Sequence, residues 1–213
     1  MSRADEASPF RVLAISDRTL MGPDPVATAR RLWDHRLPSW ALQWREKSAS
    51  PREVYRDLLT LKTDLENDPA ILVNDRVDLA LALGLHVHLT EQSIPIRVAR
   101  TLLPAGTWIG RSVHSAARAR EAAMEGADYL LFGPIFDTPS KRAYGAPQGL
   151  AALAAVAGAV SVPVIAVGGI DRTTAPRCAE HGASGVAAIR EIWESDDPAR
   201  RLSELHDAFV DSL

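Results

Sequence analysis

The sequence predicts a single (β/α)8 barrel, and three observations indicate it. Short apolar runs alternate with amphipathic segments along the chain, giving eight strand–helix units in 213 residues. The run Tyr129-Leu130-Leu131-Phe132 is too short for a helix and suits a strand covered on both faces, as in a parallel sheet. A hydrophobic content of 46% is enough to bury one full core. A doubly wound open sheet is the alternative fold that this alternation allows.

The apolar runs and the amphipathic segments fix the expected order of elements. The expected strands cover residues 11–16, 41–45, 70–74, 87–89, 108–112, 129–132, 164–167 and 185–188. The expected helices cover residues 25–35, 51–65, 77–83, 94–103, 116–125, 150–160, 173–181 and 198–213. Asp24 before Pro25 and Ser50 before Pro51 are helix-start signals, and Gly126 is a helix-end signal. We expect one domain over residues 1–213, with residues 1–10 as a flexible N-terminal extension.

The composition excludes several classes of partner. A net charge of −3 and a pI near 6.1 give no reason to expect nucleic acid or an anionic membrane surface as a partner. Cys178 is the only cysteine, so no intramolecular disulfide forms and a reducing compartment is expected. The first ten residues are too polar for a secretory signal, and no apolar run approaches membrane-spanning length. We expect a cytoplasmic protein that acts on small molecules; the composition leaves the oligomeric state open, a homodimer included.

Polar residues follow the second expected strand, where a barrel places its chemistry. Gln43, Arg45 and Lys47 share one face if the extended conformation continues, because side chains alternate with period 2. Two cations and an amide at the mouth of a barrel would suit a multiply charged anion. The alternative is that Arg45 and Lys47 only solvate a loop. Gln43 argues against that alternative, because the interior of a buried strand is a poor place for an unpaired amide.

The third and fourth expected strands add candidates for anion and metal binding. Asn74 is a candidate anion contact, while Asp75 either caps the next helix or binds a hard cation such as Mg²⁺. Alternation places His86 and His88 on one face, but carboxylates suit Mg²⁺ better than imidazoles do. The spacing of cysteines and histidines does not indicate a zinc site.

The fifth and sixth expected strands contribute candidates for catalysis. Ser112 and His114 are candidates for hydrogen bonding or proton transfer, whereas Ser115 is explained as a helix cap. A polar loop with Thr138 and Lys141 follows the sixth strand. A buried strand that opens into such a loop is a typical site layout in α/β proteins, although a plain surface loop is the alternative.

The seventh and eighth expected strands point to a phosphate. Gly168 and Gly169 let backbone N–H groups approach a ligand without obstruction by a Cβ atom. Ile189 and Arg190 follow the eighth strand and are the other expected binding residues. The loops after strands seven and eight form the usual phosphate site of a (β/α)8 barrel.

Five motifs in this order resemble the thiamine phosphate synthase/TenI family. They are Gln43-x-Arg45-x-Lys47, Asn74-Asp75-Arg76-Val77-Asp78, Gly110-x-Ser112-x-His114-Ser115, Gly133-Pro134-Ile135-Phe136-x-Thr138-x-x-Lys141 and Gly168-Gly169-Ile170. The resemblance extends over residues 11–209. It implies either of two activities: coupling of a pyrimidine diphosphate to a thiazole phosphate, or tautomerisation of a thiazole carboxylate phosphate.

For the synthase activity, the resemblance implies a dissociative mechanism in which cations and Mg²⁺ hold the leaving pyrophosphate. A pyrimidine methyl cation forms and the thiazole nitrogen captures it. The implied pyrophosphate contacts are Arg45, Lys47, Asn74 and Lys141, and the implied Mg²⁺ ligand is Asp75. Gln43 and Ser112 would face the pyrimidine, while Thr138, Gly168 and Gly169 would bind the thiazole phosphate.

Two positions depart from the synthase pattern. Ser93 stands where a second Mg²⁺-binding aspartate is usual, and Glu91, two positions away, is a weak candidate to replace it. Arg190 stands where serine is common; we predict that it contacts the phosphate, the alternative being an ion pair with Glu191 or Glu194.

The second branch, TenI-type thiazole tautomerases, would use His114 as acid and base. Such an enzyme has no pyrophosphate leaving group and therefore no use for Lys47, Asn74, Asp75 and Lys141 together. We accordingly predict the synthase, with Mg²⁺ as its cofactor. A non-catalytic paralogue that binds a thiamine precursor is the third hypothesis.

Overall fold

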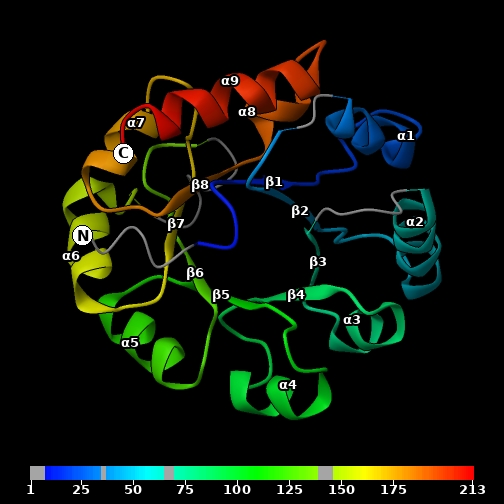
Figure 1. Cartoon of the computed structure of the whole chain (residues 1–213), viewed down its shortest axis with the longest axis horizontal. Coiled ribbons are helices and arrows are strands. Elements are labelled where there is room, and N and C mark those ends of the chain that lie inside the picture. Colours follow the sequence, from blue (N-terminus) through cyan, green and yellow to red (C-terminus); the bar gives the residue numbers. More distant parts are fainter. Residues whose placement is uncertain (1–7, 35–36, 65–69, 139–145) are drawn as a thin grey trace.

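The eight predicted strands form one closed, parallel barrel, which confirms the predicted fold and excludes the open sheet (Figure 1). The computed structural model describes residues 8–34, 37–64, 70–138 and 146–213. The strands are β1 (Val12–Ile15), β2 (Trp40–Trp44), β3 (Ala70–Asn74), β4 (His86–Leu89), β5 (Ile109–Val113), β6 (Tyr129–Phe132), β7 (Val164–Val167) and β8 (Gly185–Ala188). Each pairs with the strands before and after it in the chain, and β8 returns to β1.

Helices surround the barrel and follow the predicted order with two differences. They are α1 (Pro25–Arg30), α2 (Pro51–Asp64), α3 (Val77–Leu83), α4 (Ile96–Leu102), α5 (Ala116–Met124), α6 (Gly149–Ala159), α7 (Ala175–Glu180), α8 (Arg190–Trp193) and α9 (Pro198–Val210). The helix predicted over residues 25–35 is wrong at its end, because α1 tightens into a 3-10 turn, η2 (Arg31–Trp33). The short helix α8 was not predicted, since four residues are too few to show a helical period.

Side chains alternate between two hydrophobic layers, as strands buried on both faces require. The inner layer fills the barrel and consists of Phe10, Leu13, Ile15, Ala41, Leu72, Tyr129, Leu131, Ile165 and Ala187. The larger outer layer lies between the strands and the helices, where Trp44, Leu58 and Phe209 are fully buried. The interior of the barrel is therefore mainly hydrophobic, and polar side chains found there indicate a functional site.

Phe10 corrects the predicted N-terminal extension. Its side chain is fully buried inside the barrel, and its ring lies edge-on to that of Tyr129 with centroids 5.0 Å apart. Such edge-to-face packing of aromatic rings is favourable. Phe10 therefore belongs to the barrel core and not to a flexible extension, and residues 1–7 lie outside the described part of the chain.

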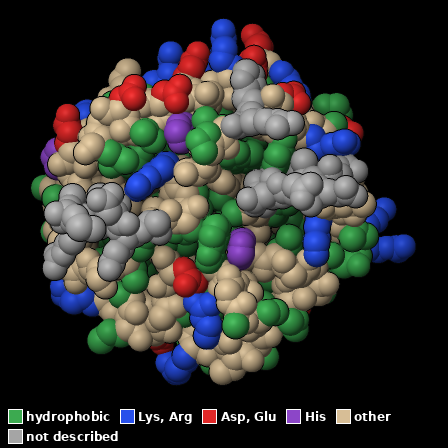
Figure 2. Space-filling view, in the orientation of Figure 1, with side chains coloured by type: hydrophobic (Ala, Val, Ile, Leu, Met, Phe, Trp, Pro, Cys, Tyr) green, Lys and Arg blue, Asp and Glu red, His purple; other side chains and the backbone are tan. Residues whose placement is uncertain are grey.

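The molecular surface carries both signs of charge. Figure 2 shows acidic and basic side chains interspersed around the periphery of the face in view, in keeping with the net charge of −3. The side chain of Cys178 is buried. Among the described residues, no helix has the length and apolar character needed to span a bilayer.

Candidate functional site

The carboxyl ends of β2 and β3 place an amide pair inside the barrel mouth. Gln43 Nε2 donates a hydrogen bond of 2.8 Å to Asn74 Oδ1. The Gln43 side chain is 1% exposed, and its Oε1 atom has no hydrogen-bond partner among the described residues. A buried acceptor left without a donor is costly, so this oxygen is available to a ligand that donates.

Arg45 and Lys47 continue from Gln43 toward solvent. Gln43 is buried, Arg45 is half-buried and Lys47 is exposed, so the three side chains form a gradient from the barrel interior outward. Burial lowers the pKa of the Arg45 guanidinium, against the opposing effect of the carboxylates of Asp17 and Glu46. Within the described residues, the Arg45 side chain makes no hydrogen bond or ion pair. Arg45 is thus a partly desolvated cation near the charges of Asp17 and Glu46, without a direct ion pair in the described part of the chain.

The neighbouring carboxylate, Glu46, is occupied elsewhere. Its two oxygens accept from Ser16 Oγ at 2.9 Å and from Arg18 Nε at 3.0 Å. Ser16 Oγ in turn accepts from the backbone N–H of Arg45 at 2.7 Å. This network fixes the backbone at Arg45 and keeps the Glu46 charge paired with Arg18, which leaves the Arg45 charge available to an anion.

A second polar group inside the barrel is centred on His88. His88 was not predicted to belong to the site, although its neighbour Ser112 was. The Nδ1 atom of His88 lies 2.8 Å from the Tyr129 hydroxyl and its Nε2 lies 2.8 Å from Ser112 Oγ. Burial, and secondly the positive charges of Arg45 and Arg111, lower the pKa of His88 to about 3. The imidazole is therefore neutral at physiological pH and holds the Ser112 hydroxyl at the mouth.

The room for this group comes from a glycine. A Cβ atom on Gly110 would lie 2.0 Å from Tyr129 Cζ. Any residue other than glycine at position 110 of β5 would therefore collide with the tyrosine ring. Burial raises the pKa of Tyr129, which keeps its hydroxyl protonated as a partner for His88. The sequence signal was present in the Gly110-x-Ser112 spacing and the His88 alternation, but the contact with Tyr129 depends on the fold.

Asp75 occupies a left-handed backbone position with φ of 60°. The N-cap position of α3 is Arg76, which makes no side-chain capping bond, so Asp75 is not the cap that was considered for it. Instead, Ser93 Oγ donates to Asp75 Oδ1, and the hydroxyls of Ser93 and Thr90 lie 2.8 Å apart. Ser93, which stands where a second metal-binding aspartate is expected, therefore contacts Asp75, the expected first metal ligand, directly.

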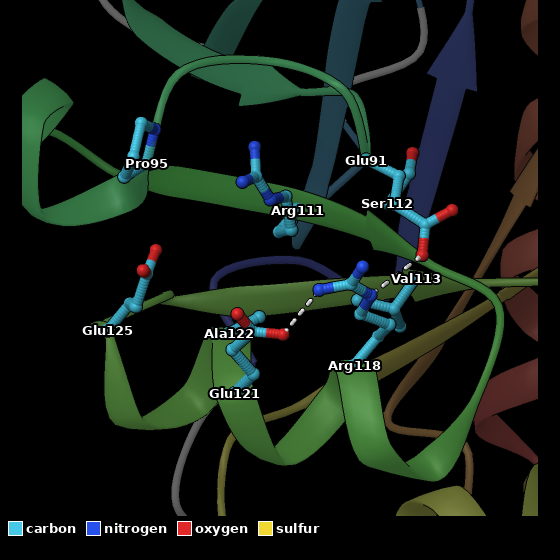
Figure 3. A pocket seen from close by; sticks show the side chains of 9 residues that line it. All are labelled: Glu91, Pro95, Arg111, Ser112, Val113, Arg118, Glu121, Ala122 and Glu125. Atoms are coloured by element: carbon cyan, nitrogen blue, oxygen red, sulfur yellow. Dashed lines mark hydrogen bonds and ion pairs between the residues drawn. The ribbon is translucent and has the colours of Figure 1, made fainter.

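Glu91, the weak metal candidate, has a different neighbour. Its Oε1 atom lies 3.8 Å from Arg118 Nε on α5, and both line a cavity of about 130 Å³ with Arg111 and Glu121 (Figure 3). Ser93, not Glu91, is thus the residue on this turn that contacts Asp75. In the part of the chain that the structure describes, no three His, Cys, Asp or Glu side chains are grouped so as to hold a metal ion.

His114 lies beyond β5 with an exposed side chain. Its Nδ1 is 2.7 Å from the carbonyl oxygen of Gly133. Because a carbonyl only accepts, Nδ1 carries the proton in this contact, and in the neutral ring Nε2 is left as the basic nitrogen. The neighbouring Ser115 caps α5 as predicted, accepting from the backbone N–H of Arg118 at 3.3 Å.

The glycine pair after β7 is explained first by packing within the chain. A Cβ atom on Gly168 would lie 2.5 Å from Pro134 Cβ, and one on Gly169 would lie 2.7 Å from Phe136 Cβ. Both glycines have positive φ, 98° and 65°, which a side chain would strain. The glycines at these two positions were predicted to let a ligand approach the backbone. The structure adds a second reason for glycine, since the loops after β6 and β7 pack directly on each other.

The loops after β7 and β8 offer unused backbone donors. Val167 pairs with Ala187 on the neighbouring strand, and Gly169 and Ile189 each follow these paired residues by two positions. Across the described residues, the backbone N–H groups of Gly169, Ile189 and Arg190 find no acceptor. The Arg190 side chain is exposed, and its Nη1 pairs with Glu194 Oε1 at 2.8 Å, which is the alternative orientation considered for it. The predicted contact of Arg190 with a phosphate stays a prediction.

Two predicted residues lie on the loop after β6. Thr138 is half-buried. Lys141 lies outside the described residues, so its place at the mouth stays a prediction.

The fold and this polar mouth define a (β/α)8-barrel protein with a site suited to phosphorylated small molecules. Residues 12–192 match the family described as thiamine monophosphate synthase. The chain therefore belongs to the thiamine monophosphate synthase family, as its five motifs predicted.

Individual relatives agree with this assignment. A thiamine-phosphate synthase from Haloarcula marismortui is 42% identical over 172 residues, which are 78% of this chain and 82% of the relative. A relative from Geobacter sulfurreducens is 46% identical over 136 residues, and the match spans only 64% of that relative's length. The structure of a thiamine phosphate pyrophosphorylase from Pyrococcus furiosus superposes with a TM-score of 0.82 at 31% identity, covering 96% of this chain and 98% of that one.

Proposed function

We propose that this protein is a thiamine-phosphate synthase, a transferase that couples hydroxymethylpyrimidine diphosphate with hydroxyethylthiazole phosphate to give thiamine phosphate and pyrophosphate. The observation that carries the proposal is Arg45, a half-buried cation that makes no ion pair with the described residues, close in sequence to the Gln43–Asn74 pair. An anion-binding mouth of this kind fits a diphosphate substrate. Relatives from Haloarcula marismortui and Chloroflexus aurantiacus that are named thiamine-phosphate synthase support the same reaction.

In this mechanism the cations after β2 and β6 stabilise the leaving group. Negative charge grows on the pyrophosphate as its bond to the pyrimidine methylene carbon breaks. Arg45, with Lys47, Asn74 and Lys141, would hold that charge. Because Ser16 already fixes the Arg45 backbone, this part of the site needs little reorganisation during the reaction.

The pyrimidine would lie deeper in the mouth, against the two interior polar groups. Gln43 Oε1 lacks a donor, and an amino substituent on the pyrimidine ring would supply one. Ser112, held by neutral His88, would offer its hydroxyl to a ring nitrogen. Two fixed hydrogen bonds would orient the methylene carbon toward the thiazole nitrogen.

The donors near Asp75 fit Mg²⁺ in type, because they are one carboxylate and the hydroxyls of Ser93 and Thr90. Asp75 would hold the ion together with the oxygens of the diphosphate. Bound there, Mg²⁺ would neutralise charge on the pyrophosphate oxygens. With one carboxylate in place of two, the protein alone should hold the ion weakly.

The thiazole phosphate would bind between the loops after β7 and β8. The backbone N–H groups of Gly169, Ile189 and Arg190, which have no acceptor among the described residues, are suitable donors to phosphate oxygens. Thr138 on the loop after β6 would add a hydroxyl. From this position the thiazole nitrogen would attack the pyrimidine methylene carbon as the bond from that carbon to the pyrophosphate breaks.

One observation favours the tautomerase as a second candidate. The exposed His114 ring is oriented by Gly133, with Nε2 as the free base, which suits proton transfer on a thiazole. Glu91 Oε1 lies 3.8 Å from Arg118 Nε, and its role as the second carboxylate stays a prediction.

An assay with purified protein separates these activities. The protein is offered each thiazole phosphate isomer, with and without pyrimidine diphosphate and Mg²⁺, and the products are separated by chromatography. We expect thiamine phosphate and pyrophosphate in equal amounts, only when all components are present. Arg45→Ala should slow the coupling. Arg97→Ala, which changes an exposed arginine on α4, is the matched control and should not. Isomer interconversion without the pyrimidine would establish the tautomerase instead, and no turnover of either kind would indicate a non-catalytic paralogue.

A further inference from the structure

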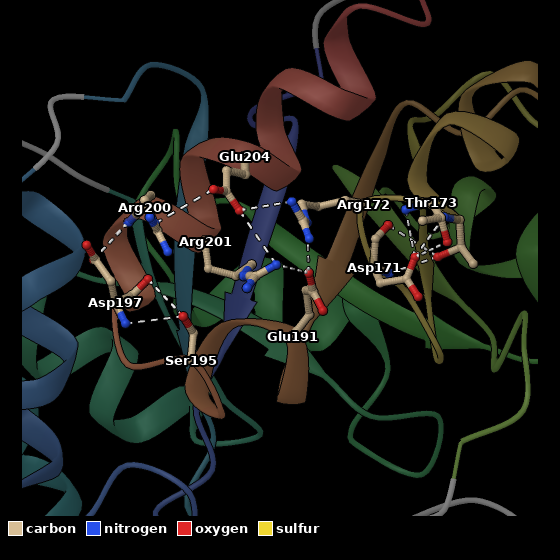
Figure 4. Close-up of polar contacts among 10 residues, drawn as sticks. Asp171, Arg172, Thr173, Glu191, Ser195, Asp197, Arg200, Arg201 and Glu204 are labelled. Carbon is tan, nitrogen blue, oxygen red and sulfur yellow. Dashed lines mark hydrogen bonds and ion pairs between the residues drawn. The ribbon is translucent and has the colours of Figure 1, made fainter.

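Four charged side chains near the loops after β7 and β8 form a closed ring (Figure 4). Glu191 Oε1 lies 3.3 Å from Arg201 Nη1 and 3.8 Å from Arg172 Nε. Glu204 Oε2 lies 3.6 Å from Arg201 Nη1 and 3.4 Å from Arg172 Nη1. Each carboxylate therefore contacts both guanidinium groups. An isolated surface pair contributes little, but a network of this kind holds its members in one geometry.

The ring joins three separate elements. Arg172 belongs to the turn after β7, Glu191 is the second residue of α8, and Arg201 and Glu204 lie on α9. Helix α9 packs on both α7 and α8 and is long enough to act as a fixed support. The Glu191 side chain is only 20% exposed, which limits its freedom to move.

The turn that carries Arg172 is stiff. Asp171 Oδ1 accepts from the backbone N–H groups of Thr173 and Thr174 at 2.7 and 2.9 Å. Thr174 Oγ1 then donates to the Gly169 carbonyl oxygen at 3.1 Å. These hydrogen bonds connect the turn that carries Arg172 to Gly169. In the same way Glu191 is only two residues from Ile189, at the start of a four-residue helix.

We infer that this ring sets the spacing between the two loops whose backbone N–H groups receive the thiazole phosphate, so that Glu191 and Arg172 are positioning residues for that substrate. The inference rests on the proposed function for the location of the phosphate. Both residues act through the backbone rather than by touching the ligand. Three of the proposed diphosphate contacts, Arg45, Lys47 and Asn74, lie at the ends of β2 and β3, which carry no member of the ring.

The test compares two substrates in one set of variants. Calorimetry gives the dissociation constants of hydroxyethylthiazole phosphate and inorganic phosphate, and steady-state kinetics give KM for the pyrimidine diphosphate. In Glu191→Gln we expect both phosphate dissociation constants to rise about tenfold, as for other coupled contacts, with KM for the diphosphate changed less than about twofold. Arg172→Gln, which leaves the Glu191–Arg201 contact, should show the same pattern more weakly. Glu191→Asp keeps the charge and should restore most of the affinity.

The control is Glu121→Gln, which removes an exposed carboxylate from the Arg118 pair on α5. It should change neither the phosphate dissociation constants nor KM for the pyrimidine diphosphate. Circular dichroism establishes that each variant is folded. Unchanged phosphate affinity in folded Glu191→Gln, or an equal loss for the diphosphate, overturns the inference while leaving the proposed function standing. Inorganic phosphate tests the ring even if the thiazole compound is not the substrate. A wild-type protein that binds neither phosphate probe overturns both.

Discussion

The buried His88 leads to a prediction about acid sensitivity. In the folded protein its pKa is about 3, whereas an unperturbed histidine titrates near 6.5. Below pH 6.5 the unfolded chain binds a proton that the folded protein refuses, so stability falls as the pH decreases toward 3. Between pH 7 and pH 5, His88 is protonated in the unfolded chain but not in the folded protein over a range of about 1.5 pH units. At about 1.4 kcal/mol per unit, His88 alone should remove about 2 kcal/mol from the free energy of unfolding.

Replacing His88 with glutamine isolates this contribution. The variant lacks a titrating group at the position, although it loses the contacts to Tyr129 and Ser112 and is expected to be less stable at every pH. Urea unfolding at pH 7 and pH 5 gives the free energy for both proteins, and only the difference between the two pH values is compared. We expect the wild type to lose about 2 kcal/mol more than the variant. An equal loss in the two proteins would refute the assignment of the acid sensitivity to His88.

The charged residues of the mouth provide three more tests. Arg45→Ala and Lys141→Ala should each raise the barrier to coupling by about 3 kcal/mol without unfolding the protein, measured by steady-state kinetics, and near-normal rates would remove these cations from the mechanism. A crystal structure with phosphate at the glycine loop after β7 should show the Arg190 guanidinium on that anion, and a guanidinium still on Glu194 would contradict this. Calorimetry should show no Mg²⁺ binding to the free protein but Mg²⁺-dependent pyrophosphate binding that Asp75→Asn largely abolishes. Equal pyrophosphate binding without the metal would count against the synthase.

The barrel was predictable because each strand is buried on both faces. A continuous apolar run such as Tyr129–Phe132 records that burial directly in the sequence. Helix α8 left no such record, because its four residues are shorter than the window in which a helical period appears. Phe10 was misplaced for a similar reason, since a single aromatic residue after a polar segment does not reveal that it enters the barrel.

The candidate site was predictable in its location but not in its internal contacts. Alternation correctly placed Gln43 and Arg45 near the end of β2, and the structure then joined Gln43 to Asn74 on β3. Period 2 also put His88 on the right face of β4, but it gave no information on depth or on a partner from β6. The packing of Gly169 against Phe136 was equally invisible, because two loops far apart in sequence meet only when the barrel closes.

Closure of the barrel between β1 and β8 also has a consequence for folding. The register pairs Leu13 with Ala187, and Trp193 Nε1 donates to the Ile15 carbonyl oxygen at 2.7 Å, so the first strand is completed by the last part of the chain. Because these partners are far apart in the sequence, the edge of β1 that faces β8 stays unpaired during synthesis until β8 has left the ribosome. Until then the edges of β1 and of the latest strand to form are unpaired and open to association with other chains. A chain terminated before Gly185 would keep the β1 and β7 edges permanently open, and its expected fate is aggregation rather than a smaller stable barrel.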